Sequence, residues 1–418
     1  MKHRIFLISY FSFLICTAMA MQVQTDRTWY LAGEAITVNV SDDNALIAYA
    51  ELCDTQGLAA GVAVSLKAGV GTGVIELPSS LHSGYYMLSV YTRHDAKVAQ
   101  RLVAVINPLH SSVDDDIEWV EAPDASLSYP EGGTNVSAQS NEASSRAAGG
   151  TTVWGTLPPE TEGTIIAARV KNVFDGHAFT ASQIRPALSI IGQQIHYFEG
   201  KMVNDTLAVF YTFGVHGRQP LVLSAVSSTG VSLPVELVSP FATLLPQQLP
   251  HLVFHYQRSE VETRSLDMQR HQRFLAGQPE EAPLPYDATV FGTMPDLTYN
   301  LDEYRQFLTI REVLLEYVSC VRTAKINGTS RLIVRKEQEV YDTSTPTLVL
   351  IDGMPVSDTE RLLNYDARRI HYINIYGDQY TFGNSIYNGI LSFVTRSGRL
   401  TNYPTEANMQ YLVYDFPR

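Results

Sequence analysis

Short apolar runs separated by glycine, proline and aspartate fill the first hundred residues of the chain. Residues 35–41 alternate apolar and polar side chains, which is typical of a strand with one buried face. Further strand candidates follow at 47–52, 62–66, 74–77, 83–92 and 101–108. Short strands at this close spacing favour a β-sandwich, which we place at 21–108.

A second group of apolar runs lies further along the chain. Its strand candidates, each bounded by glycine, aspartate or proline, are 164–170, 187–191, 194–198, 207–212 and 221–226. The same pattern therefore predicts a second β-sandwich over 151–256. No function follows from this unit beyond presenting a surface or spacing its neighbours.

Two polar segments separate these regions from each other and from the C-terminal part. An acidic run without a basic residue comprises Asp114, Asp115, Asp116, Glu118, Glu121 and Asp124. A glycine-, serine- and asparagine-rich stretch follows it, so 109–150 is expected to be a linker. Calcium binding is the alternative, but the loop spacing of a calcium site is missing. Mixed charges and a proline-rich loop predict an exposed connector at 257–298.

A helical pattern of apolar residues begins near residue 310. Thr309 and Glu312 form a capping box, and Ile310, Val313 and Leu314 share one face with Tyr317 and Val318. The Asn327-Gly328 pair predicts a hairpin. A second capping box at Ser357 and Glu360 predicts a short helix between strands at 348–351, 370–376 and 390–395. These elements together predict an α+β domain at 299–400, followed by a tail at 401–418.

This last domain carries a set of spaced residues at Asp352, Gly353, Pro355, Asn388, Gly389, Thr395 and Gly398. This set resembles the plug domain of TonB-dependent outer-membrane receptors. In plugs this motif is architectural, so we expect Asp352 to cap a turn and Gly353 to supply its backbone conformation. The resemblance covers about 300–398, and we expect no receptor barrel after it.

The resemblance implies a protein that docks on, or occludes, an outer-membrane β-barrel made by another chain, either a transporter or a secretion translocon. Aromatic side chains in this region are the candidate contacts with that partner: Tyr372, Tyr376, Tyr380, Phe382 and Tyr387. Partial burial of these rings inside the domain is an equally weighted alternative. The second hypothesis for function is a surface adhesin or structural subunit built on immunoglobulin-like domains.

The first β-sandwich has a resemblance of its own. Residues 26–34 and 84–88 resemble the strand starts of macroglobulin-type sandwiches. The reactive thioester segment of that family is missing, because Cys53 and Cys320 are followed by other residues. We therefore do not expect this protein to trap other proteins covalently through a thioester. Both cysteines are interpreted as buried and unpaired.

Composition and charge narrow the setting of the protein. The 418 residues carry a net charge of −13, which argues against nucleic acid as a partner. A positive start, an apolar run and a small-residue cleavage pattern predict a signal peptide at 1–20. We therefore expect an exported protein of the periplasm or outer membrane of a Gram-negative-type envelope. Association with the membrane would occur through the partner, since no later segment is long and apolar enough to span it.

Motifs that would indicate an enzyme are absent from the sequence. No nucleophile elbow or phosphate loop occurs, and His251 and His255 lie in a strand-like segment without the glutamate of a zinc protease. We therefore predict no catalytic residue, no metal and no cofactor, although a hydrolase with an unrecognised site stays as a third hypothesis. The expected architecture is mainly β, with two β-sandwiches followed by a plug-like α+β domain.

Overall fold

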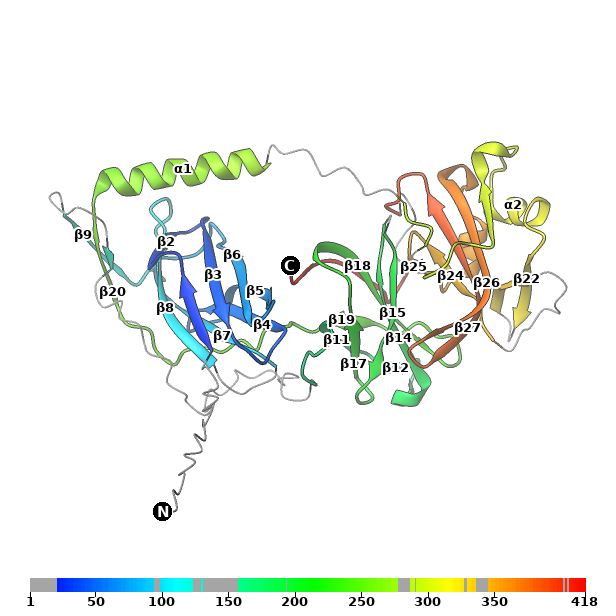
Figure 1. Cartoon of the computed structure of the whole chain (residues 1–418), viewed down its shortest axis with the longest axis horizontal. Helices are drawn as coiled ribbons and strands as arrows, with labels where there is room; N and C mark the ends of the chain where they lie inside the picture. The colour runs from blue at the N-terminus through cyan, green and yellow to red at the C-terminus, as the bar shows by residue number, and fades with distance from the viewer. Residues whose placement is uncertain are drawn as a thin grey trace, which may run out of the picture. The chain divides into compact units, whose positions relative to one another are not determined.

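A computed structural model describes residues 21–93, 98–122, 129–130, 157–192, 194–276, 286–289, 291–326, 329–335, 345–400, 403 and 406–418. Strands account for 49% of the described residues and helices for 11%, which confirms the mainly β class. The chain divides into two compact units (Figure 1). The first combines Met1–Arg146 with Leu244–Val261, and the second combines Ala147–Thr243 with Glu262–Arg418. The predicted signal peptide at 1–20 lies outside the described residues.

The first unit is built on a β-sandwich. One sheet has the order β1-β3-β6 and the other β2-β8-β7-β4-β5. Their bounds are β1 (Gln22–Thr25), β2 (Trp29–Leu31), β3 (Ala35–Ser41), β4 (Ile47–Cys53), β5 (Leu58–Ser65), β6 (Val70–Glu76), β7 (Gly84–Tyr91) and β8 (Val98–Ile106). Alternate side chains of β3, such as Ile36 and Val38, pack against Leu88 and Val103 from the other sheet. The alternation in the sequence therefore identified the buried face correctly.

A third sheet of this unit uses residues that the sequence pattern assigned elsewhere. It has the order β10-β20-β9, with bounds β9 (Ile117–Glu121), β10 (Tyr129–Pro130) and β20 (Leu252–Tyr256). Strands β9 and β10 lie inside the predicted linker, and β20 lies in the predicted second sandwich. Leu252 and Phe254 pack on Trp29 and Leu31, so burial draws this distant strand to the first unit. Sequence-local patterns do not specify such long-range pairing.

The second unit contains another β-sandwich. Its sheets have the orders β16-β17-β11-β19 and β15-β14-β18-β28. The bounds are β11 (Thr164–Val170), β14 (Ile184–Ile190), β15 (His196–Glu199), β16 (Lys201–Met202), β17 (Leu207–Thr212), β18 (Gly217–Ser227), β19 (Val235–Leu237) and β28 (Gln410–Phe416). A small ribbon, β12 (Val173–Phe174) with β13 (His177–Ala178), and the 3-10 turn η2 (Ala181–Gln183) complete it. The two faces share one core that includes Ile166, Leu188 and Phe210.

Strand β28 corrects the prediction of a C-terminal tail. It pairs with β18 along seven residues, from Gly217 opposite Phe416 to Leu223 opposite Gln410. Tyr414 and Phe416 are buried in the core of the sandwich. The alternating apolar and polar residues of β28 form a short, isolated pattern. Such a pattern does not indicate that the strand pairs with β18, almost two hundred residues earlier.

The α+β region occupies the stretch between these sandwich strands. Its sheet has the order β21-β26-β27-β24-β25, in which β24 runs parallel to β27. The bounds are β21 (Leu297–Asn300), β24 (Leu348–Ile351), β25 (Met354–Pro355), β26 (Ile370–Phe382) and β27 (Ser385–Thr395). The predicted hairpin is confirmed as β22 (Val321–Ile326) with β23 (Thr329–Val334), where Ile326 pairs with Thr329. Short 3-10 turns lie at η3 (Leu301–Glu303) and η4 (Ala367–Arg369).

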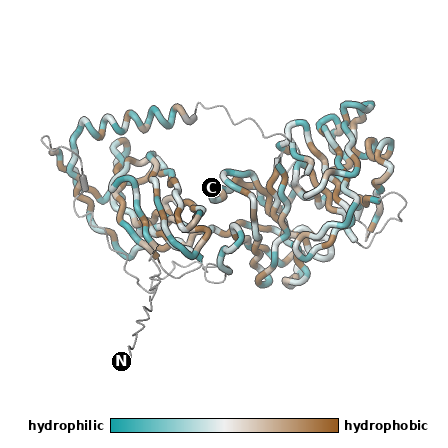
Figure 2. Tube along the Cα trace, viewed as in Figure 1, coloured by the Kyte–Doolittle hydropathy of each residue, from teal (hydrophilic) through white to brown (hydrophobic). Residues whose placement is uncertain are grey.

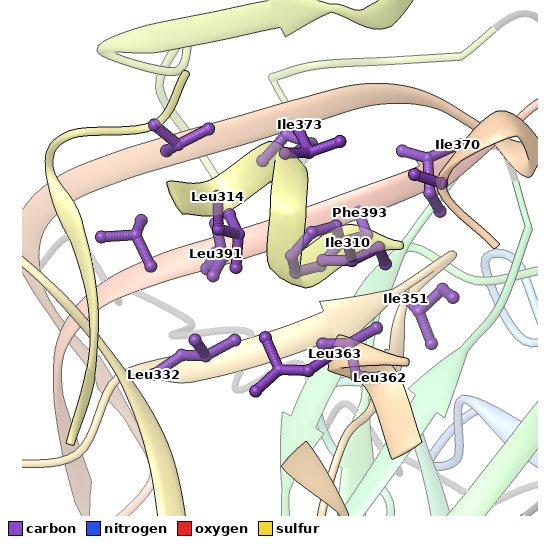
Figure 3. Close-up of a cluster of buried hydrophobic side chains, with 14 of the residues drawn as sticks. Ile310, Leu314, Leu332, Ile351, Leu362, Leu363, Ile370, Ile373, Leu391 and Phe393 are labelled. Atoms are coloured by element: carbon purple, nitrogen blue, oxygen red, sulfur yellow. The ribbon is translucent and has the colours of Figure 1, made fainter. Parts of the chain in front are cut away.

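Two short helices cover the core of this region (Figure 3). Helix α2 (Ile310–Glu316) begins at the predicted Thr309–Glu312 capping box and buries Ile310 and Leu314. Helix α3 (Thr359–Leu363) adds Leu362 and Leu363 to the same core. The N-cap of α3 is Asp358, not the predicted Ser357, since the Asp358 carboxylate accepts from the N–H of Arg361 at 3.0 Å. Ser357 bonds instead to the carboxylate of Glu406.

The predicted connector contains the longest helix of the described residues, α1 (Arg258–Ala276). It is hydrophilic along most of its length (Figure 2), and Asp267 pairs with Arg270 at 3.0 Å across one turn. The mixed charges that suggested an exposed connector therefore belong to a largely exposed helix, in which Asp267 and Arg270 form a pair three residues apart. None of the helices in the described part of the chain is long and apolar enough to cross a membrane.

Candidate functional site

The plug-like motif forms a single hydrogen-bonded network around a buried carboxylate. Asp352, at the β24–β25 turn, is fully buried. Its Oδ1 accepts from the N–H of Thr395 at 2.7 Å, and its Oδ2 accepts from the Thr395 hydroxyl at 2.5 Å and from the N–H of Leu400 at 2.9 Å. The Thr395 Oγ1 in turn accepts from the N–H of Gly398 at 3.0 Å. The carboxylate therefore fixes the end of β27 to the turn after β24.

The environment of Asp352 is unfavourable for its charge. Burial raises the pKa of the Asp352 carboxyl, while the hydrogen bonds from Thr395 and Leu400 oppose that rise. No cation pairs with Asp352 among the described residues. Both of its carboxylate oxygens accept hydrogen bonds from Thr395 or Leu400 of the same α+β region. These contacts fit the expected architectural role of the residue.

The remaining motif residues complete the same local structure. Pro355 pairs with Leu350 across the turn. The N–H of Asn388 donates to the Pro346 carbonyl at 2.8 Å, and its carbonyl accepts from the Thr347 hydroxyl at 2.9 Å. A side chain at Gly389, whose φ is +82°, would approach the Tyr376 carbonyl to 3.0 Å. The structure thus brings all seven residues onto strands β25 and β27, the turn between β24 and β25, and the turn after β27.

Gly353 marks the place where the α+β region contacts the second sandwich. Its φ is +90°, and a Cβ added there would lie 2.8 Å from Ile195 Cγ2 and 2.9 Å from the Ile190 carbonyl oxygen. The N–H of Gly192 also donates to the Asp352 carbonyl at 2.9 Å. The turn that the motif forms therefore lies directly against β14 and the loop after it.

Substituting Gly353 tests this close approach. We expect Gly353→Ala to lower the free energy of unfolding by about 2 to 4 kcal/mol, because it combines backbone strain with overpacking. Gly292→Ala is the matched control, since Gly292 has a φ of +83° and a Cβ added to it would meet nothing within 4 Å. Urea denaturation of both purified variants gives the comparison. Equal losses would mean that contact with Ile190 and Ile195 adds nothing to the backbone strain.

The candidate aromatic contacts form two groups in the structure. Tyr376, Tyr380, Phe382 and Tyr387 belong to one cluster with Tyr197 and Phe291. Tyr376 is fully buried and Tyr387 is 9% exposed, so both rings are used inside the unit. Tyr372 lies outside this cluster and stacks on Tyr286. A role in partner contact stays a prediction for the half-buried Tyr372, Tyr380 and Phe382.

The tip of the β26–β27 hairpin is attached to strand β15 by polar groups that sequence reasoning missed. The Tyr197 and Tyr387 hydroxyls lie 3.2 Å apart, and the Ser385 hydroxyl donates to Glu199 Oε1 at 2.6 Å. Burial raises the pKa of the Glu199 carboxyl, and the bond from Ser385 opposes this rise. Burial also raises the pKa of Tyr197 and Tyr387. No motif or spacing in the sequence indicates that these side chains meet.

A cleft of about 200 Å³ lies beside this junction, within the second unit. It is lined by Arg185, Tyr197 and Glu199 from the sandwich and by residues of β23, β24 and β25, including Arg331, from the α+β region. A second cleft of about 330 Å³ shares Arg185 and Glu199 with the first and adds Lys201. The two clefts therefore combine three cationic side chains with one carboxylate.

The candidate residues for catalysis or metal binding are dispersed in the structure. Cys53 is buried and Cys320 is half-buried, and neither forms a disulfide within the described residues. His251 Nδ1 lies 2.5 Å from Asp116 Oδ1, while His255 lies within β20. The part of the chain that the structure describes holds no group of three histidine, cysteine or acidic residues that could bind a metal.

Comparisons with known proteins give only weak similarities. No protein-family model matches the chain, and no curated protein sequence does either. The BSP domain of a biofilm-associated protein is 10% identical over 57% of this chain and 30% of its own, with a TM-score of 0.18. Elastase-activated α2-macroglobulin of Escherichia coli is 12% identical over 54% of this chain and 20% of its own, with a TM-score of 0.19.

The fibronectin(III)-like modules of CbhA from Clostridium thermocellum are 9% identical over 57% of this chain and 96% of theirs, with a TM-score of 0.15. This chain spans less than a third of the length of the biofilm-associated and macroglobulin structures. Similarities at this level carry no argument about activity or partners. The mainly β architecture rests on the sheets described above.

Proposed function

We propose that this protein is an exported, non-enzymatic binding protein of the cell envelope, an adhesin or structural subunit whose β domains present the α+β region. The observation that carries the proposal is the shared core of the second unit. Ile191 and Val222 of the sandwich pack among the core residues of the α+β region, and β28 returns from that region to the sandwich. The two parts thus form one body with a fixed outer surface.

A shared core favours recognition at an outer surface over occlusion of a barrel. A stopper that enters a pore has to present its own exterior to the barrel wall. Here the β24–β25 turn lies against Ile190 and Ile195, and the hairpin tip is bonded to Glu199. Releasing these contacts would expose apolar surface and leave Glu199 without its donor, both of which cost free energy.

Docking on an outer-membrane barrel is the second candidate. Tyr372, Tyr380 and Phe382 on the long β26 strand retain part of their ring surface outside the core, and aromatic side chains are favoured at the centres of protein interfaces. Under this candidate the protein would bind the rim of a barrel made by another chain, and it would associate with the membrane through that partner.

Labelling of intact cells separates the two candidates. If the proposal holds, a membrane-impermeant biotin reagent will label the protein on whole cells, and added purified protein will compete with cells for attachment to their surface. Affinity purification from detergent-solubilised envelopes is the companion measurement. Absence of surface labelling, together with recovery of a stoichiometric β-barrel protein, would replace the proposal with barrel docking.

A further inference from the structure

Strand β28 forms an outer edge of the second sandwich. Among the described residues it pairs with β18 alone, at the end of the sheet β15-β14-β18-β28. Pro220 of β18 lies opposite Val413, and its carbonyl accepts from the N–H of Ile191 on the side away from β28. Because Pro220 also has no N–H, this pair forms no backbone hydrogen bonds across the two strands. The N–H and C=O groups of Val413 therefore point away from β18.

The same direction holds for every second residue of β28. Backbone groups alternate in direction along an antiparallel strand, so those of Tyr411 and Asp415 point outward together with those of Val413. In the part of the chain that the structure describes, no hydrogen bond uses these outward groups. Tyr411 is 51% exposed, Val413 is 48% exposed and Asp415 is exposed as well. The edge of β28 is therefore open along its length.

The sequence of β28 does not protect this edge. Edge strands of natural proteins are commonly very short, interrupted by a bulge, or marked by lysine or proline. Strand β28 has seven residues without lysine or proline, and its register with β18 is uninterrupted. Two of its outward side chains, those of Tyr411 and Val413, are aromatic or aliphatic. A long, open edge of this kind is a site where another chain can add a strand.

Other outer strands of similar length in the described part of the chain are covered or charged. They are β5, β6, β22 and β23. Strands β5 and β6 lie against each other, since a Cβ added to Gly71 would come within 2.3 Å of the Ser65 carbonyl oxygen. Strand β22 carries Arg322 and Lys325, and Leu332 of β23 is buried. These features distinguish β28 from the other edges.

The order of side chains on β28 fits a second copy of the same strand. In antiparallel pairing centred on Val413, this residue lies opposite its own counterpart, and Tyr411 lies opposite Asp415 of the second copy. The outward backbone groups of all three residues then meet in hydrogen-bonded pairs. No two acidic side chains lie opposite each other, and Asp415 also has Arg218 of β18 beside it. A two-fold axis at Val413 thus satisfies the whole edge.

We propose that two copies of this protein associate through β28, whose antiparallel pairing joins their four-stranded sheets into one continuous sheet. The inference goes beyond the proposed function and does not depend on it. Backbone hydrogen bonds along the edge supply the affinity, and the side chains of Tyr411 and Val413 add apolar contact. A dimer of this kind presents the α+β region twice, which would strengthen attachment to a surface that carries many copies of a ligand.

Sedimentation equilibrium of the purified protein tests this inference. We expect the mass to rise to that of two chains between about 1 and 100 μM protein. Val413→Pro should raise the dissociation constant at least about tenfold, because it removes the outward N–H at the axis and leaves the bonds to β18 in place. Val413→Thr keeps both the N–H and a β-branched side chain, so it should change the dissociation constant less than about threefold.

A charged variant keeps the test decisive if the proline variant does not fold. Val413→Lys retains the backbone donor but places two positive charges opposite each other, so it should also weaken association at least about tenfold. Circular dichroism establishes that each variant is folded. Unfolding measured well below the dissociation constant reports on the single chain, and should show no large loss for Val413→Lys. In the natural protein, exchange of the outward amide hydrogens should slow as the concentration rises.

A single-chain mass at every concentration would overturn the inference. So would a dimer that Val413→Pro and Val413→Lys both leave intact, or outward amides whose exchange does not depend on concentration. The proposed function is tested separately, by labelling and attachment of intact cells. A protein that is surface-exposed and blocks attachment, yet stays a single chain, would retain the proposed function and lose the dimer.

Discussion

Replacing Phe416 by alanine should lower the free energy of unfolding of the second unit by about 3 to 5 kcal/mol. Phe416 is 1% exposed and contacts Tyr414 in the core of the sandwich. Removing the ring leaves a cavity between the two sheets that neighbouring backbone cannot fill. Urea denaturation, together with hydrogen exchange at the β18 amides that pair with β28, measures the loss.

Tyr411→Ala is the control for this prediction, because Tyr411 lies on the same strand with 51% of its surface exposed. Its substitution should change the free energy of unfolding by less than about 0.5 kcal/mol. If 401–418 were a tail, as its sequence suggests, the two variants would behave alike. That outcome would contradict the assignment of β28 to the sandwich.

The second large effect is expected at the buried carboxylate. Asp352→Ala should lower the free energy of unfolding by about 3 kcal/mol or more, since it leaves the N–H groups of Thr395 and Leu400 without an acceptor. Asp358→Ala removes an exposed carboxylate that caps helix α3, and should cost only about 1 kcal/mol. A loss at Asp352 no greater than that at Asp358 would mean that solvent satisfies the network.

The pH dependence of this site has a definite sign. Burial raises the pKa of Asp352 above its unfolded value, which lies near 3.9. The protonated folded form is therefore favoured, and the stability it contributes is complete below about pH 3.9 and declines as the pH rises through the folded pKa. Asp352→Asn does not titrate, so its deficit relative to the natural chain should widen as the pH falls from neutral towards 4. A deficit that narrows would reverse this assignment.

The residues that the sequence identified correctly act over short distances. Thr309 caps α2 through a residue three positions away, and Asn327-Gly328 joins strands that meet at Ile326 and Thr329. Asp352 and Gly353 shape a turn of their own strand. In each case the chain alone specifies the geometry, because the partner lies within a few residues or follows from a tight turn.

Other features depend on partners that local patterns do not specify. Glu199 contacts Ser385, and Tyr197 contacts Tyr387, although almost two hundred residues separate the members of each pair. The carboxylate of Glu406, which lies in the predicted tail, accepts a hydrogen bond from the N–H of Ser357. Burial of Tyr376 and Tyr387 likewise depends on this long-range packing. The sequence therefore indicated which aromatic residues the α+β region contains, but not which of their rings are buried inside the second unit.

The position of β28 has a consequence for the order in which the protein folds. Strand β18 pairs with β14 along one edge, but its other edge has no partner until residues 410–416 have been synthesised, after the whole α+β region. Until then the long outer edge of β18 and the open core beside it are exposed to other chains. Contacts of such sequence separation slow folding and prolong exposure to aggregation. We therefore expect this protein to need chaperone assistance while it folds.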